Sequence, residues 1–214
     1  MKNMRTRVKI CGITRVDDAL AAVAAGAGAL GFIFWPGSPR FIDPFRARKI
    51  VRALPPFITA VGVFVNQPLE YVNGVASLAR LGAVQLHGDE TIGFAAAITV
   101  PIIKAIPLAA AGEAAIAEWP MATTLLLDVH DPVKRGGTGR TIDWTAAAAV
   151  AARRHVLLAG GLTPDNVADA VARVRPFGID VSSGVERAPG IKDHQRLGAL
   201  FEALHDHSDI PARS

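Results

Sequence analysis

The sequence predicts a single-domain α/β protein of the (βα)8 type, a closed parallel eight-stranded TIM barrel with an outer ring of helices. Short runs rich in Val, Ile, Leu and Phe alternate with Ala-rich stretches whose apolar residues recur at helical spacing. Eight such units share 214 residues, about 27 residues per unit, which lies near the lower size limit of this fold. Runs such as 125–127 and 156–158 are continuously apolar, as expected of strands covered on both faces.

The elements follow in order along the chain. The expected strands are residues 8–11, 29–34, 60–65, 83–86, 102–106, 124–128, 155–159 and 178–181. The expected helices are residues 16–25, 44–53, 69–81, 91–98, 110–119, 144–153, 164–174 and about 193–205. Gly26 and Gly82 are expected to end helices because glycine tolerates positive φ, and Thr163 to cap the helix that has Pro164 in its first turn.

One alternative architecture stays open, because a doubly wound open sheet would give the same alternation of strands and helices. The number of units favours the closed barrel. No linker or shift in composition suggests a second domain, so we expect the barrel to span residues 1–205, followed by a polar C-terminal tail at 206–214.

Composition excludes several classes of partner. Half of the residues (50%) are hydrophobic and 20% are charged, which is enough to bury a full core. The net charge is +4, but the basic residues are scattered, so we expect no nucleic acid partner. Residues 19–39 carry no charge, yet they are rich in Ala and interrupted by glycines and by Pro36. We therefore expect a helix, a turn and a strand there rather than contact with a membrane.

Cys11 is the single cysteine, so no disulfide can form within the chain, which fits a cytoplasmic location. The basic segment 1–7 leads into only four residues before Gly12, far fewer than the apolar region of a signal peptide.

Three weak motifs are set aside. Residues 26–31 fit GxGxxG, but they follow a helix and lead into a strand, the reverse of a dinucleotide site. Residues 136–141 faintly resemble a phosphate-binding P-loop, but Lys134 stands at the position of its first glycine and Arg140 at that of its lysine. We expect a mobile lid over the sixth strand instead. His205 and His207 have no further ligand at a suitable spacing, so we expect no metal.

Five chemically distinctive residues fall at or just after the carboxyl ends of the expected strands. They are Cys11, Arg40, His87, Asp128 and Asp180. Each alone has a simpler explanation, such as a small buried filler, a turn or helix cap, or a surface charge. In a closed barrel, however, all five would face one pocket.

Two loops near the end of the chain strengthen this interpretation. Gly160 and Gly161 follow the seventh strand, and Ser182, Ser183 and Gly184 follow the eighth. Small residues also permit tight turns, but backbone N–H groups and hydroxyls at this position commonly bind phosphate in βα barrels.

Seven groups of residues, in order along almost the whole chain, make the sequence resemble the phosphoribosylanthranilate isomerases. They are KICGIT at 9–14, GFIF at 31–34 with Pro36 and SPR at 38–40, VGVFVN at 61–66, VQLHGDE at 84–90, GGTG at 136–139 with Asp143 and Trp144, LAGGL at 158–162, and DVSSGVE at 180–186 with Pro189, Gly190, Lys192 and Asp193. Departures are confined to residues 129–135 and to the Ala-rich helices.

The resemblance implies an enzyme of tryptophan biosynthesis that needs no cofactor. Its phosphorylated substrate, N-(5-phosphoribosyl)anthranilate, would undergo an Amadori rearrangement to 1-(2-carboxyphenylamino)-1-deoxyribulose 5-phosphate. The resemblance carries the general base onto Cys11 and the general acid onto Asp128, and places Arg40 near the substrate carboxylate. His87 and Asp180 follow as pocket residues, and the phosphate falls on the backbone of Gly161, Ser183 and Gly184. Gly160 and Ser182, in the same two loops, are expected to contact the substrate as well. A monomer or a homodimer is expected.

The residue types suit such a reaction. Opening the sugar ring needs a proton for its oxygen, and the following step removes a proton from C2, so an acid and a base must stand on different sides of the sugar. Burial raises the pKa of a thiol, so Cys11 needs nearby positive charge to act as a base. Lys9 is the expected source, because residues two apart on a strand share a face.

Two other functions stay open at this point. The first is another phosphate-binding barrel enzyme, either an indoleglycerol-phosphate synthase, for which a Lys-rich pocket is expected, or a histidine-pathway isomerase, for which Asp is expected where Cys11 stands. The second is a non-catalytic barrel that binds a sugar phosphate or senses oxidants, although a sensor would need a second, resolving thiol.

Overall fold

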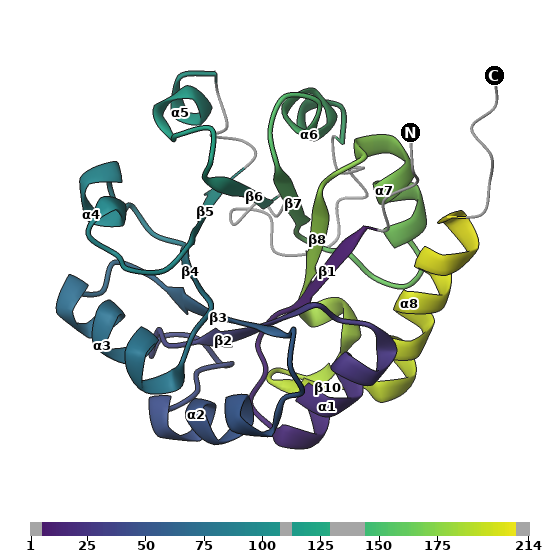
Figure 1. The fold of residues 1–214 in the computed structure, drawn as a ribbon. Coiled ribbons are helices and arrows are strands. Elements are labelled where there is room, and N and C mark those ends of the chain that lie inside the picture. The colour runs from purple at the N-terminus through teal and green to yellow at the C-terminus, as the bar shows by residue number, and fades with distance from the viewer. Residues whose placement is uncertain (1–5, 108–112, 129–143, 209–214) are drawn as a thin grey trace.

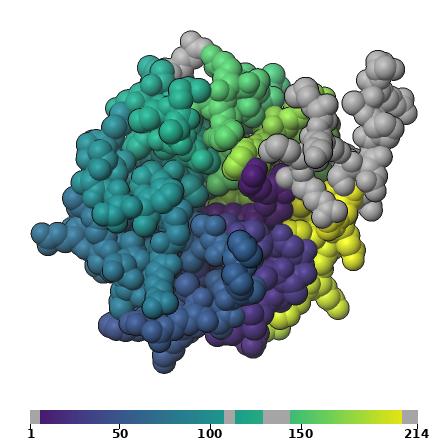
Figure 2. Space-filling model, viewed as in Figure 1, coloured from purple at the N-terminus to yellow at the C-terminus, as the bar shows by residue number. Residues whose placement is uncertain are grey.

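The computed structural model describes residues 6–107, 113–128 and 144–208. In this part of the chain the strands β1 to β8 form a closed barrel in sequence order, each parallel to its neighbours, with β8 pairing back onto β1. Figure 1 shows this ring of strands with the helices outside it, and Figure 2 shows the same view with all atoms filled in. The predicted barrel is confirmed, and the open sheet is wrong.

The element bounds lie close to the predicted ones. The barrel strands are β1 (Arg7–Ile10), β2 (Ala29–Ile33), β3 (Thr59–Phe64), β4 (Ala83–Leu86), β5 (Ile102–Pro107), β6 (Thr124–Asp128), β7 (Val156–Ala159) and β8 (Gly178–Val181). The helices are α1 (Val16–Ala25), α2 (Pro44–Ala53), α3 (Leu69–Ala79), α4 (Ile92–Ala96), α5 (Glu113–Glu118), α6 (Trp144–Ala151), α7 (Val167–Val174) and α8 (His194–Ser208).

Two predicted helix ends are wrong. α3 ends at Ala79 and is capped by Arg80, which adopts the left-handed conformation (φ 54°), so Gly82 is not its cap. α7 begins at Val167 rather than after Thr163, because residues 164–166 form a turn. In that turn the Asn166 side chain accepts a hydrogen bond from the Thr163 N–H (2.8 Å) and donates one to the Gly161 carbonyl (2.9 Å). By contrast, Gly26 ends α1 with φ 121°, as predicted.

The main core lies between the barrel and the helices. Alanines such as Ala19, Ala22 and Ala47 are fully buried there, so the Ala-rich helices pack closely on the sheet. A smaller cluster of Ala105, Leu126, Leu157 and Ala159 packs apart from this core. Leu126 alternates along β6 with Leu125 and Leu127 of the main core, as the period-two geometry of strands requires, and this places the smaller cluster inside the barrel.

A short element after β8 was not predicted. A 3₁₀ turn, η2 (Ser183–Val185), leads into an antiparallel pair of strands, β9 (Glu186–Ala188) and β10 (Ile191–Lys192). Gly190 has φ 77° in the connection, a conformation that side chains disfavour. This hairpin carries two charged side chains into the site described below.

The charge-free segment 19–39 forms the end of α1, a turn and β2. Among the described residues, no helix has the length and hydropathy needed to cross a membrane. The expected lid at 136–141, the start of the expected helix at 110–112 and the chain after Ser208 lie outside the described residues.

Candidate active site

Cys11 lies directly after β1, where its N–H donates to the carbonyl of Val181 at the end of β8 (2.8 Å). The register of the two strands sets Lys9 opposite Asp180, and both are buried. Lys9 Nζ donates to Asp180 Oδ1 at 2.9 Å, and its ammonium lies close enough to the Cys11 thiol for the two groups to change each other's pKa. A Cβ on Gly31 would lie 2.8 Å from Cys11 Sγ, so the absence of a side chain there makes room for the thiol.

The protonation of this group depends on competing effects. Burial raises the pKa of the Cys11 thiol, and the carboxylate of Asp180 raises it further; Lys9 and Lys192 lower it only in part. For Lys9, burial alone would lower the pKa, but Asp180 and Cys11 raise it above its usual value. Lys9 is therefore charged and placed as predicted, while the free thiol still holds its proton more tightly than an exposed cysteine does.

His87 and Asp128 occupy another part of the same barrel end. His87 follows β4 and Asp128 is the last residue of β6; His87 Nε2 and Asp128 Oδ2 are 4.0 Å apart. Gln85 Nε2 lies 2.9 Å from His87 Nδ1, and when the amide donates there, the neutral imidazole carries its proton on Nε2. Burial lowers the pKa of His87 despite the opposing effect of Asp128, so the ring is neutral at pH 7.

A buried ion pair holds the turn that follows β4. Lys104 Nζ on β5 lies 3.0 Å from Glu90 Oε2 and donates to the Gly88 carbonyl at 2.5 Å. Glu90 accepts from the Gly88 N–H (2.9 Å) and from the Asn66 N–H after β3 (2.8 Å). This network, which was not predicted, fixes the backbone next to His87.

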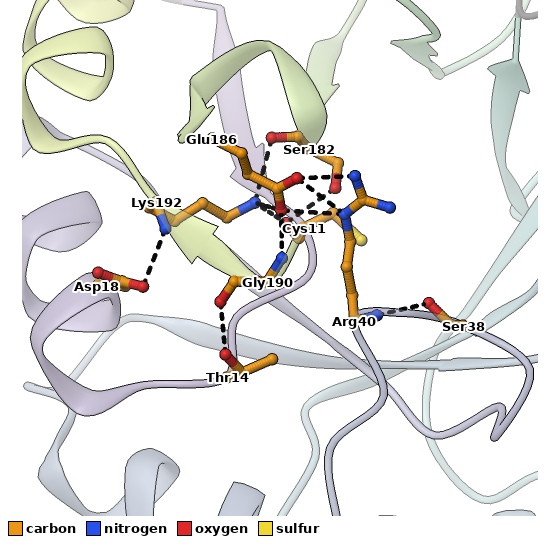
Figure 3. Close-up of polar contacts among 9 residues, drawn as sticks. All are labelled: Cys11, Thr14, Asp18, Ser38, Arg40, Ser182, Glu186, Gly190 and Lys192. Carbon is orange, nitrogen blue, oxygen red and sulfur yellow. Dashed lines mark hydrogen bonds and ion pairs between the residues drawn. The ribbon is translucent and has the colours of Figure 1, made fainter. Parts of the chain in front are cut away.

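Arg40 reaches the site from the loop after β2 and pairs with Glu186 of β9 (Figure 3). Arg40 Nε lies 3.0 Å from both carboxylate oxygens of Glu186, and Nη2 lies 2.7 Å from Oε2. Burial would raise the pKa of Glu186, but its hydrogen bonds with Arg40 and Lys192 outweigh this effect and lower the pKa. Glu186 is therefore ionised at neutral pH.

Lys192 of β10 joins this ion pair to the ends of β1 and β8. Its fully buried Nζ donates to Glu186 Oε1 (2.8 Å), to the Cys11 carbonyl (2.6 Å) and to the Ser182 carbonyl (3.1 Å). Its backbone N–H donates to the Asp18 carboxylate on α1 at 3.0 Å. Lys192 thus fixes the backbone that carries Cys11 and orients Glu186 at the same time.

The two loops predicted to bind phosphate pack against each other. Gly160 (φ 92°) and Gly161 (φ 65°) adopt conformations that favour glycine, and Gly161 is exposed. A Cβ on Gly184 would lie only 1.8 Å from the Leu162 carbonyl, so any side chain would separate the loops. Ser183 is exposed beside them, and the Ser182 hydroxyl donates to the Cys11 carbonyl (3.3 Å).

The structure therefore brings every predicted site residue to the end of the barrel formed by the strand carboxyl ends. Sequence reasoning missed Glu186, Lys192, Glu90 and Lys104, although all but Lys104 stand within or beside the motifs that carry the resemblance. Among the described residues, no group of three or more His, Cys, Asp or Glu side chains is arranged to hold a metal ion.

Comparison with known proteins gives consistent results. The model of the family N-(5'phosphoribosyl)anthranilate (PRA) isomerase matches residues 8–203. The N-(5'-phosphoribosyl)anthranilate isomerase of Citrifermentans bemidjiense is 48% identical over 197 residues, which are 92% of this chain and 95% of that relative.

Solved structures agree with this match. The isomerase of Thermotoga maritima, an enzyme described as dimeric in another structure, superposes with a TM-score of 0.86 and 43% identity, covering 94% of this chain and 99% of its own. A PRA isomerase bound to reduced 1-(o-carboxyphenylamino)-1-deoxyribulose 5-phosphate superposes with a TM-score of 0.82 and 42% identity, over the same shares of the two chains.

Proposed function

Because the chain belongs to the N-(5'-phosphoribosyl)anthranilate isomerase family, we propose that Cys11 is the general base and Asp128 the general acid of its reaction. The enzyme acts in tryptophan biosynthesis and converts N-(5-phosphoribosyl)anthranilate into 1-(2-carboxyphenylamino)-1-deoxyribulose 5-phosphate. The observation that carries the proposal is the position of these two groups. A buried thiol beside an ammonium directly follows β1, and a carboxyl group ends β6, three strands away around the ring.

Two proton transfers account for the reaction. The carboxyl group of Asp128 donates its proton to the ring oxygen as the bond from that oxygen to C1 breaks, and the anthranilate nitrogen supplies the electron pair for a C1=N bond. The Cys11 thiolate then removes the proton from C2, the electrons of that C–H bond form C1=C2, and the electron pair of C1=N returns to the nitrogen. The resulting enol becomes the ketone when C1 takes up a proton and the C2 hydroxyl loses one. Proton exchange with water returns Cys11 to the thiolate and Asp128 to the carboxylic acid. Substrate and product are isomers, so no external oxidant or reductant is consumed.

Two anionic groups of the substrate orient the sugar between acid and base. We assign the phosphate to Gly160, Gly161, Ser182, Ser183 and Gly184, where two glycine-containing loops meet. We assign the anthranilate carboxylate to the planar guanidinium of Arg40. We assign His87 and Asp180 to the same pocket. His87, which contacts Gln85, lies beside Asp128, and Asp180, which is paired with Lys9, lies beside Cys11.

The activity is measured through the fluorescence of anthranilate phosphoribosylated in the assay mixture. The purified enzyme should accelerate consumption of the phosphoribosylated intermediate in the presence of a chelator and without added nucleotide. An unchanged rate of signal loss on addition of enzyme would contradict the proposal.

Arg40→Lys should raise KM by about tenfold or more, although the positive charge is retained. A lysine ammonium is a point charge and cannot make the two parallel hydrogen bonds that a guanidinium makes to a carboxylate. The lost bond is charge-assisted, and such bonds account for an affinity change of about this size. Steady-state kinetics of the two proteins provide the measurement, with kcat expected to change less than KM. Equal Michaelis constants would show that Arg40 does not bind the carboxylate.

The pH dependence should reveal the raised pKa of Cys11. Iodoacetamide reacts with the thiolate, and burial favours the neutral thiol, so the rate of alkylation of Cys11 should increase with pH into the range above the usual thiol pKa of about 8.5. Lys9→Met should move this increase to higher pH, and Asp180→Asn should move it to lower pH, because the two charges act on Cys11 in opposite directions.

The rate of iodoacetamide alkylation of Cys11, measured between pH 6 and pH 10 on the three proteins, tests this expectation. Lys49→Met is the matched control, since Lys49 is exposed on α2. Shifts of the same sign in Lys9→Met and Asp180→Asn would contradict the electrostatic explanation.

The proposal includes a cytoplasmic location and a monomeric or homodimeric state. A base that is a free thiol must stay reduced, which the cytoplasm favours. Light scattering of the purified protein distinguishes a monomer of 22.5 kDa from a dimer.

A further inference from the structure

One edge of the Arg40 guanidinium, formed by Nε and Nη2, binds Glu186, and the edge formed by Nη1 and Nη2 does not. Glu186 accepts from Nε and from one hydrogen of Nη2. No residue in the described ranges accepts from the two hydrogens of Nη1 or from the second hydrogen of Nη2. In Figure 3 this nitrogen of Arg40 carries no dashed line. The remaining N–H bonds of Nη1 and Nη2 that run parallel match the two oxygens of a carboxylate.

The position of that edge is fixed from two sides. Glu186 is 4% exposed, and it is itself fixed by Lys192 Nζ (2.8 Å) and by the Gly190 N–H (3.2 Å). On the other side, a Cβ on Gly12 would lie 2.7 Å from Arg40 Cδ, so the stem of Arg40 packs against the residue that follows Cys11. Glu186 and Gly12 together limit the rotamers of an arginine that is still 21% exposed.

Charge decides whether this arrangement attracts or repels a carboxylate. A lone Glu186 would cancel the charge of Arg40, but Lys192 supplies a second positive charge on the buried side. Arg40, Glu186 and Lys192 therefore carry a net charge of +1, and Arg40 is the most exposed of the three. A carboxylate approaching from the barrel mouth meets the guanidinium first.

We propose that Glu186, neutralised by Lys192, is a positioning residue that determines the selectivity of this enzyme for a substrate bearing an aromatic carboxylate. This inference rests on the proposed binding of the substrate carboxylate by Arg40. Glu186 does not compete with the substrate for Arg40, because the two carboxylates use different edges of the guanidinium. It holds the free edge in place before the substrate arrives, which lowers the entropic cost of binding.

Glu186→Gln tests this proposal on two substrates, N-(5-phosphoribosyl)anthranilate and the matching compound made from aniline, which lacks the carboxylate. We expect KM for the anthranilate compound to rise about 10- to 100-fold with kcat changed less than about threefold, and both constants for the aniline compound to stay within about threefold of wild type. In the Arg40→Ala background, Glu186→Gln should cause no further loss.

Matched controls separate the possible failures. Glu202→Gln, at an exposed position on α8, should leave both substrates unaffected. If Arg40→Ala does not reduce the preference for the carboxylate, the proposed role of Arg40 is wrong. If Arg40→Ala reduces it and Glu186→Gln does not, or if Glu186→Gln impairs both substrates equally, the positioning role of Glu186 is wrong.

The melting temperature shows whether Glu186→Gln folds. If it does not, a second variant, Glu186→Asp, tests the proposal. Glu186→Asp keeps the negative charge beside Lys192 but withdraws the carboxylate from Arg40 by one methylene. It should show a smaller loss, again confined to the substrate with a carboxylate. An unchanged preference in Glu186→Asp would overturn the proposal.

Discussion

Replacing Cys11 with alanine should reduce turnover by about a thousandfold while the barrel stays folded. A positioned general base contributes roughly 10² to 10⁴ to the rate, and the thiol is the group that we assign to the removal of the C2 proton. The structural cost should be small, because the change removes one sulfur atom from a buried site and leaves the Lys9–Asp180 ion pair in place. The measurement is kcat at saturating substrate, together with the melting temperature.

Cys11→Ser separates the chemistry of the thiol from its size. A serine hydroxyl fits the space between Lys9 and Gly31, but an alcohol is far less acidic than a thiol, so the serine variant should be nearly as inactive as the alanine variant. Reduced 1-(o-carboxyphenylamino)-1-deoxyribulose 5-phosphate, the compound bound in the related structure, serves as a reduced product analogue. The affinity of both variants for this analogue should stay within a few fold of wild type. More than about a tenth of wild-type turnover in either variant would show that another group removes the proton.

The barrel and the placement of the reacting residues follow from local sequence patterns. Period-two alternation puts Lys9 and Cys11 on one face of β1, and the parallel order of the strands brings Asp180 beside them. Counting strands is enough to place Asp128 three positions away from Cys11. Such predictions need only the strand order and the register, both of which short apolar runs indicate well.

Glu186 and Lys192 could not be predicted in the same way. Their hairpin has strands of three and two residues, too short for a periodic signal, and it is held by contacts far apart in sequence, such as Lys192 to the Cys11 carbonyl. The start of α7 was misplaced for a similar reason. Both Thr163 and Asn166 are residues that cap helices, and the hydrogen bonds of the Asn166 side chain to the Gly161 carbonyl and the Thr163 N–H accompany the later start.

The competing enzyme classes also show the limit of composition. A Lys-rich pocket was expected for a synthase, and three buried lysines do lie at this barrel end: Lys9, Lys104 and Lys192. Each is paired with a buried carboxylate, Asp180, Glu90 or Glu186 respectively. The number of buried lysines therefore does not distinguish a synthase from an isomerase, because a lysine paired with a carboxylate can position its neighbours or shift their pKa. The family match and the motifs around Cys11 decide between the classes.

The expected loss is also large, about 10² to 10⁴ in kcat, when Asp128 is changed to asparagine. The amide has nearly the shape of the carboxyl group but cannot transfer a proton to the ring oxygen, so ring opening should become rate-limiting. His87 lies 4.0 Å from Asp128, but burial lowers its pKa, so little of the imidazole is protonated and able to replace the acid.

The matched control for Asp128→Asn is Asp89→Asn, at the same end of the barrel, where Asp89 bonds to the side chain of Asn66 (2.7 and 3.2 Å) and should not affect the rate. Single-turnover kinetics provide the measurement, with affinity for the reduced product analogue determined separately. That analogue already has an open chain, so its binding does not need the proton that Asp128 supplies, and affinity should be nearly unchanged. A loss of affinity as large as the loss of turnover would instead make Asp128 a binding residue, and the ring oxygen would then have to receive its proton from another group.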